Sequence, residues 1–176
     1  SNPSEVGAWD SPGFAENVAV SGSTAYLADG PYGLRVVDVS NPTMPAQIAH
    51  AFDTNYAVDV AINGRYAYIA ADGAGLLVAE ISNPHYPIEA GAYDTIGYAR
   101  SVAVAGNRVV LADEHNGLVI LNISDPIHPI MSGSVQLEGW AFDVTVSGNL
   151  AYVAAAFGGL QIVNISNPAV PVVSGS

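Results

Sequence analysis

The chain is built on Gly33-Leu34-Arg35-Val36-Val37-Asp38-Val39-Ser40-Asn41-Pro42, an apolar segment that ends in a Ser-Asn-Pro turn. The segment returns three times, at residues 75–84, 117–126 and 159–168, and each step is 42 residues long. No insertion or deletion interrupts this spacing. A fixed step of this length indicates one structural unit repeated along the chain.

Each repeat divides into four short segments of β-branched and other apolar residues, separated by Gly, Pro, Asn and Ser. Such segments predict β-strands. A glycine, Gly22 in the first repeat, permits a tight turn after the first strand because glycine tolerates a positive φ. A proline, Pro45, precedes the fourth strand and places it at the sheet edge, since proline has no N–H to donate. The strands expected in the first repeat are residues 17–21, 25–28, 34–39 and 46–52.

No segment shows a helical period of 3.6 residues, so the chain is predicted to be all-β. Four strands in about 42 residues is the pattern of a β-propeller blade, whose twisted sheets pack face to face. The third strand is apolar on both faces, as a sheet between two others requires. The prediction is a single propeller domain, residues 1–176, built from four 42-residue, four-stranded antiparallel blades. The expected blades are 11–53, 54–95, 96–137 and 138–176, preceded by an outer strand at 4–10.

Three of the repeated segments, residues 34–38, 118–122 and 160–164, are each followed by a Val/Ile-Ser-Asn/Asp-Pro turn. They resemble the LVIVD repeat of bacterial and archaeal proteins, and the resemblance covers nearly the whole chain. It implies a β-propeller, often in secreted or cell-surface proteins, and therefore an extracellular or cell-surface location. The final Asp of the motif remains only as Asp38 and becomes Glu or Asn elsewhere, which argues against a required catalytic acid.

Four blades leave open how the ring closes. An open arc would expose two apolar blade faces, and large exposed apolar patches rarely stay unpaired. We expect a homodimer of two half-rings that closes an eight-bladed ring; the alternatives are a closed four-bladed monomer and a fragment of a longer propeller. The expected outer strands at 4–10 and 171–176 would compete for one place in a closed ring.

The net charge is −12, with sixteen carboxylates against four arginines and no lysine. Nucleic acid is therefore not an expected partner, because binding to phosphates needs clustered Lys and Arg. No apolar run approaches the roughly 18–20 residues that span a bilayer, and no basic stretch followed by an apolar one begins the chain, so neither membrane insertion nor a signal sequence is predicted. Cysteine is absent, which excludes disulfides, thiolate metal sites and a Cys nucleophile.

The loops between blades and the loops between second and third strands should emerge on one face, where we expect a ligand site. Aromatic residues recur there at intervals of 42, each close after a carboxylate. Such pairs can bind sugars or a basic, aromatic-containing peptide by stacking and charge-assisted hydrogen bonds. Alternatively, residues repeated in every blade wedge adjacent blades together. The candidates are the repeated Phe14, Tyr56, Tyr98 and Trp140, and the departures from the repeat Tyr32, Phe157, Arg100 and His115.

Polar residues also recur on the first strands, facing the ring axis. They could line a channel for a cation or polar ligand, or be solvated around a water-filled axis. These axial residues are Asn17, Asp59, Ser101 and Asp143.

No cofactor is expected from the sequence. Calcium is the weak alternative, because oxygen-rich loops can hold it, but no Asp-x-Asp-x-Asp-Gly series is present. The four histidines occupy four different repeat positions and so form no symmetric metal ring. The calcium candidates are Asp29, Asp72 and Asp113.

Enzyme signatures such as a Gly-x-Ser-x-Gly elbow, a phosphate-binding loop or a His-Glu-x-x-His pair are absent. The prediction is a non-enzymatic binding or scaffold module for a protein or glycan partner. The main alternative is a hydrolase or lyase that uses Asp59 and Asp143 at the axis. A third possibility is that the blades serve assembly alone.

Overall fold

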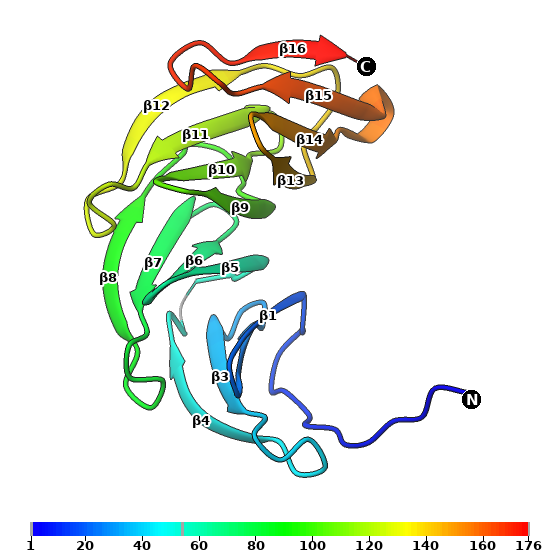
Figure 1. Cartoon of the computed structure of the whole chain (residues 1–176), viewed down its shortest axis with the longest axis vertical. Helices are drawn as coiled ribbons and strands as arrows, with labels where there is room; N and C mark the ends of the chain where they lie inside the picture. The colour runs from blue at the N-terminus through cyan, green and yellow to red at the C-terminus, as the bar shows by residue number, and fades with distance from the viewer. Residues whose placement is uncertain (1, 54, 176) are drawn as a thin grey trace.

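The computed structural model describes residues 2–53 and 55–175 (Figure 1). Its strands form four separate four-stranded antiparallel sheets, each built from consecutive strands. The first two blades are β1 (Asn17–Ser21), β2 (Thr24–Ala28), β3 (Leu34–Asp38), β4 (Ala46–Ala51), β5 (Asp59–Asn63), β6 (Tyr66–Ala70), β7 (Leu76–Glu80) and β8 (Ile88–Tyr93). The last two are β9 (Ser101–Ala105), β10 (Arg108–Ala112), β11 (Leu118–Asn122), β12 (Ile130–Val135), β13 (Asp143–Ser147), β14 (Leu150–Ala154), β15 (Leu160–Asn164) and β16 (Val172–Gly175).

The all-β propeller architecture expected from the repeat is confirmed. A short 3-10 turn, η1 (Ala156–Gly158), interrupts the last blade, and the described residues contain no helix long and apolar enough to cross a membrane. Each third and fourth strand pair shifts register at one position, between Val36 and Val37 in the first blade. Such a bulge bends the outer strand and increases its twist.

The last residue of each third strand has a structural role at the Ser-Asn-Pro turn. Asp38 Oδ1 accepts a hydrogen bond of 2.8 Å from the backbone N–H of Ser40, and Asn122 Oδ1 accepts the same bond from Ser124. Glu80 and Asn164 do likewise in their blades. Because the turn needs only a side-chain oxygen, Asp, Glu and Asn are interchangeable at this position.

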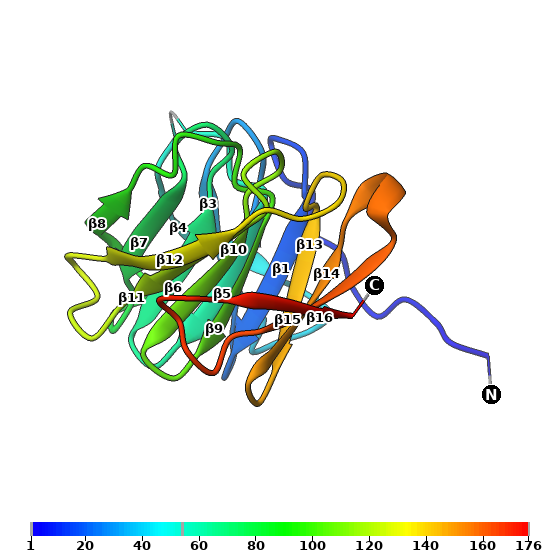
Figure 2. The same ribbon diagram turned by 90° about the horizontal axis from the view of Figure 1, so that it is seen from above.

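The blades follow one another along an arc, with the first strands on the concave side and the fourth strands on the convex rim (Figure 1). Seen from above, the sheets stack face to face (Figure 2). Each of the three junctions between blades holds its own apolar core. The arc is open, because β1 and β13, the inner strands of the end blades, stay apart (Figure 1). The closed four-bladed monomer is therefore not the arrangement of this chain.

The N-terminal segment differs from expectation. Residues 2–16 contain no strand, although 4–10 were expected to form one. The reason is that an outer strand pairs with a third strand, and among the described residues every third strand is already paired with the outer strand of its own blade. The segment nevertheless lies where an outer strand would: a Cβ added at Gly7 would collide with Pro42 O, as one at Gly133 would with Pro168 O.

Candidate functional site

The two sets of loops meet on one face, as expected from the sequence. In the first three blades, the loop between second and third strands is tied by two backbone hydrogen bonds to the loop that enters the next blade. Backbone bridges of this kind hold both loops to the scaffold. We call this surface the loop face; its bridged pairs are Gly30 with Ala57, Asp72 with Ala99, and Glu114 with Ala141.

The repeated aromatic residues lie on the loop face and remain partly exposed. Tyr56, Tyr98 and Trp140 are 39%, 49% and 42% exposed, and Phe14 is 67% exposed. Each of the first three rings lies beside a loop of the preceding blade; the Trp140 ring centroid, for example, is 4.4 Å from that of His115. The aromatics therefore cover a neighbouring loop with one side and present the other to solvent.

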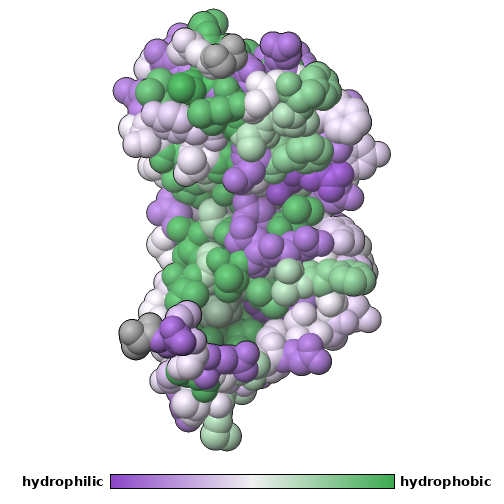
Figure 3. Space-filling model, turned by 90° about the vertical axis from the view of Figure 1, so that its right-hand side faces the viewer, coloured by the Kyte–Doolittle hydropathy of each residue, from purple (hydrophilic) through white to green (hydrophobic). Residues whose placement is uncertain are grey.

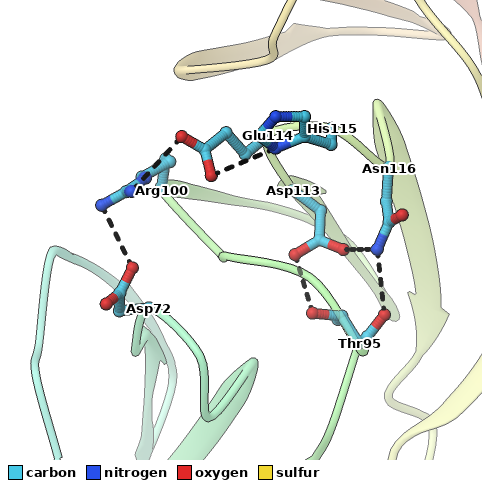
Figure 4. A network of polar contacts seen from close by, with 7 residues as sticks. All are labelled: Asp72, Thr95, Arg100, Asp113, Glu114, His115 and Asn116. Carbon is cyan, nitrogen blue, oxygen red and sulfur yellow. Dashed lines mark hydrogen bonds and ion pairs between the residues drawn. The ribbon is translucent and has the colours of Figure 1, made fainter.

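A row of charged side chains crosses the loop face from the second blade to the third (Figure 4). Arg100 Nη1 lies 3.1 Å from Asp72 Oδ1, and Arg100 Nη2 lies 3.4 Å from Glu114 Oε1. The other Glu114 oxygen lies 3.4 Å from His115 Nδ1. The Arg100 guanidinium also stands 5.7 Å from the Tyr98 ring centroid. One continuous polar chain thus links Tyr98 to the His115 ring beside Trp140.

The two carboxylates that hold Arg100 have strained backbones. Asp72 and Glu114 have φ values of 47° and 45°, at the position where the first blade has Gly30 with φ 54°. A left-handed conformation costs a residue with a Cβ about 1–2 kcal/mol. Strain of this kind tends to persist where function needs it. Ala156 has φ 43° at the same position of the last blade, so the left-handed conformation belongs to the repeated turn; Asp72 and Glu114 differ from it in placing carboxylates there.

Asp29 and Asp113 are fully buried anchors for the loops that enter their blades. Asp113 accepts hydrogen bonds from Thr95 Oγ1 at 2.7 Å and from Asn116 Nδ2 at 3.0 Å (Figure 4). Asp29 accepts one of 2.6 Å from Ser11 Oγ. Burial away from water raises the pKa of Asp113, and the bonds from Thr95 and Asn116 oppose this only in part.

The calcium candidates do not form a common site. Asp29, Asp72 and Asp113 belong to three different blades, and the first and last are used by loop anchoring. Within residues 2–53 and 55–175, no three His, Asp or Glu side chains are grouped so as to hold a metal ion.

We expect Asp113→Asn to change how stability depends on pH. The raised pKa means that Asp113 favours folding in its protonated form, so its contribution is complete below about pH 4 and is lost as pH rises through the raised pKa. The variant lacks this loss. Urea unfolding of both proteins between about pH 3.5 and 7 should show the variant gaining stability relative to the wild type as pH rises.

Asp125→Asn is the matched control. A hydrogen bond from His128 lowers the pKa of the exposed Asp125, so its contribution is lost as pH falls. Asp125→Asn should therefore lose a little stability relative to the wild type as pH rises, which is the opposite of the change expected for Asp113→Asn. If Asp113→Asn gave a curve parallel to that of the wild type, the burial effect on Asp113 would be refuted.

Three of the axial residues, Asp59, Ser101 and Asp143, join neighbouring blades by hydrogen bonds. Ser101 Oγ lies 2.8 Å from Asp59 Oδ2 and 2.9 Å from Asp143 Oδ1, and its single proton serves one carboxylate at a time. Asp59 also accepts bonds from the backbone N–H groups of Val60 and Val102. Asp59 and Ser101 are buried, whereas Asn17 and Asp143 are exposed.

The burial of Asp59 and Ser101 differs from the expectation of solvated residues around an axis, for a physical reason. The first strand is the innermost of its sheet, so some of its N–H groups have no strand to pair with. Side chains of the preceding blade supply the acceptors: Val102 donates to Asp59, and Val144 donates to Ser101. Asp59 is thereby committed to main-chain hydrogen bonds, which does not favour a role in acid–base chemistry.

Three residues on or near the loop face were not selected from the sequence. Phe142 is 43% exposed and meets the Trp140 ring edge-on. Arg35 is buried and lies 3.3 Å from Asp53 Oδ1 and 5.4 Å from the Tyr32 ring centroid. The sequence does mark Arg35 as a departure from the repeat, because the other repeats have Leu, Val or Gln at this position. Ile96 is 93% exposed with φ 63°, an unusual backbone for a β-branched residue.

Ile96 stands at a cavity of about 340 Å³ between the outer strands of the second and third blades. The cavity adjoins the Asp113 anchor, since Thr95 and Asn116 belong to its wall. Phe157, by contrast, lies in η1 of the last blade and is 79% exposed. The structure therefore brings Tyr98, Arg100, His115 and Trp140 together, and leaves Phe157 outside this group.

Comparison with solved structures supports the fold at low sequence identity. The computationally designed Ika4 protein aligns with a TM-score of 0.74 and 10% identity, over 93% of this chain and 99% of its own. The computationally designed Ika8 protein aligns with a TM-score of 0.71 and 11% identity, over 88% of this chain and 46% of its own, so this chain spans about half of it.

No curated protein matches the sequence. The LVIVD repeat, in contrast, matches it four times, at residues 12–51, 55–95, 96–136 and 138–176. These matches cover nearly the whole chain and agree with the four blades of the structure. The chain therefore belongs to the LVIVD repeat family.

Proposed function

We propose that this chain is a non-enzymatic binding module whose loop face recognises a protein or a carbohydrate. A repeat propeller is a rigid scaffold of the kind that presents loops to a ligand. The observation that supports the proposal most is that Asp72 and Glu114 both hold Arg100 beside the partly exposed ring of Tyr98, on the same face as the partly exposed ring of Trp140.

The chemistry of this group suits a flat ligand with polar edges. The exposed rings of Tyr98 and Trp140 can stack against a sugar or against an aromatic or cationic peptide side chain. Arg100 can donate to ligand oxygens, and the carboxylates can accept from hydroxyl or ammonium groups. We place this recognition outside the cell or at its surface, which the family resemblance supports.

The proposal predicts that Trp140→Ala and Asp72→Gly each weaken binding at least about tenfold without unfolding the chain. Trp140→Ala removes a stacking surface. Asp72→Gly removes a partner of Arg100 but relieves the left-handed backbone, so its free energy of unfolding should stay within about 1 kcal/mol of the wild type. Glycan and peptide arrays identify the ligand, and titration calorimetry with that ligand measures the loss.

Tyr86→Ala is the matched control, because Tyr86 is an exposed aromatic beside the Ser-Asn-Pro turn, at the opposite ends of the strands. It should bind as the wild type does. Failure of the wild type to bind any glycan or peptide would contradict the proposal, as would equal losses for Tyr86→Ala and Trp140→Ala.

A further inference from the structure

The end blades expose residues that every inner blade buries. Leu34, Leu76 and Leu118 are 0% exposed, whereas Leu160 at the same repeat position is 57% exposed. At the other end of the arc, Val18 is 54% exposed. Its counterparts Val60, Val102 and Val144 are 4%, 5% and 5% exposed. Figure 3 faces the open side of the arc and shows exposed apolar side chains toward both ends.

The three junctions inside the chain show which surfaces the exposed residues of the end blades are shaped to pack against. Each junction packs a leading face, with residues such as Tyr68, Leu76 and Val78, against the trailing face of the next blade, with residues such as Val102 and Leu111. Within residues 2–53 and 55–175, no blade packs on the leading face of the last blade or on the trailing face of the first. The two faces are complementary by the same repeat that forms the internal cores. Their residues are Tyr152, Ala154, Leu160 and Ile162 on the leading face, and Val18, Ala25, Leu27 and Val37 on the trailing face.

The axial hydrogen bonds end at the same two faces. Inside the chain, the Val102 and Val144 amides donate to the side chains of Asp59 and Ser101, one blade earlier. Asp143 holds the acceptor position in the last blade, and its side chain is exposed. Val18 holds the donor position in the first blade. Joining the two faces would extend this series by one further bond.

The N-terminal segment covers only part of the trailing face: Ala25 and Val37 are 9% and 4% exposed, whereas Val18 remains 54% exposed. A cavity of about 320 Å³ remains between residues 7–11 and the first blade, and its wall includes Trp9, Val18, Leu27 and Val37. Gly7 and Gly175 have the same repeat position, four steps of 42 residues apart. Gly175 is the last residue of β16, which is hydrogen-bonded to β15, whereas Gly7 belongs to no strand.

We propose that a second copy of this chain covers both faces and closes an eight-bladed ring with two-fold symmetry. The leading face of each copy packs on the trailing face of the other, so both seams are equivalent and no face stays open. At each seam β16 takes the place of Gly7, and the adjoining residues 2–7 of the other copy are displaced. This arc aligns with about half of the Ika8 chain, which leaves room in that fold for a second arc of the same size. This inference does not depend on the ligand of the loop face.

Light scattering coupled to size exclusion tests the proposal over a range of protein concentrations. The wild type should have twice the chain mass of 18.1 kDa, with no further growth as concentration rises. Leu160→Asp should return the mass to that of one chain, because it buries a carboxylate in each seam without a partner. Ile88→Asp is the control: Ile88 is 60% exposed on the outer strand of an inner blade, so this variant should keep the double mass.

Gly175→Val tests the place of β16. In the single chain the nearest atom to an added Cβ is Ile162 Cδ1 at 3.9 Å, so the fold tolerates it. In the ring it should meet the turn of the second copy, as a Cβ at Gly91 would meet Ile127 O at 2.6 Å, and the double mass should be lost. A single-chain mass for the wild type at every concentration, or open-ended growth, would overturn the ring. A double mass that survives Leu160→Asp would overturn these seams, and one that survives Gly175→Val would overturn the place of β16.

Discussion

Leu118→Ala is expected to lower the free energy of unfolding by about 2–5 kcal/mol, the range for removing a large buried side chain from a core. Leu118 is 0% exposed and packs with Ile120, Val144 and Val153 in the junction between the third and fourth blades. The surrounding strands are fixed by their sheets and cannot collapse into the space. Urea unfolding followed by circular dichroism measures the loss.

Leu160→Ala provides the comparison at the same repeat position. Because Leu160 is 57% exposed in the single chain, its truncation should cost less than about 1 kcal/mol there. Both variants are measured at a protein concentration at which single chains predominate. Equal losses at Leu118 and Leu160 in single chains would contradict the open arc.

Gly117→Ala is expected to be still more damaging, with a loss of about 4 kcal/mol or more. Gly117 has φ 70°, and an added Cβ would collide with the backbone oxygen of Val135. Backbone atoms of a paired outer strand cannot rotate away as a side chain can. The substitution should therefore separate β12 from β11 and open the third blade.

Gly106→Ala separates the two contributions to this loss. Gly106 has φ 63°, but nothing lies within 4 Å of an added Cβ, so only the left-handed backbone is penalised, at about 1–2 kcal/mol. The difference between the two variants in thermal or urea unfolding measures the collision at Val135. A Gly117→Ala protein as stable as Gly106→Ala would show that β12 can move without cost.

The repeat made most of the fold predictable. Glycine, proline and the Ser-Asn-Pro turn mark strand ends through local backbone preferences, which do not depend on the rest of the molecule. The expected third strand at 34–39 is observed as Leu34–Asp38, and the expected fourth strand at 46–52 as Ala46–Ala51. The prediction of a strand at residues 4–10 was wrong because a strand also needs a neighbouring strand to pair with, which local backbone preferences cannot supply.

The candidate site was predictable in its location but not in its connections. The 42-residue spacing identified Tyr98 and Trp140, and departures from the repeat identified Arg100 and His115. That Asp72 and Glu114 both hold Arg100 depends on two loops from different blades meeting side by side. The same limit applies to Asp59, whose partner Val102 lies 43 residues away.

The sequence by itself determined the four blades, their strands and their family, because all of these follow from a periodic pattern of local signals. It did not distinguish the burial of Leu118 from that of Leu160, which occupy the same position of the repeat. Only the tertiary structure decided that one is buried and the other exposed, since burial depends on whether another blade follows in space. The open arc, the two apolar faces at its ends and the Arg100 contacts across the blades are therefore properties of the folded chain.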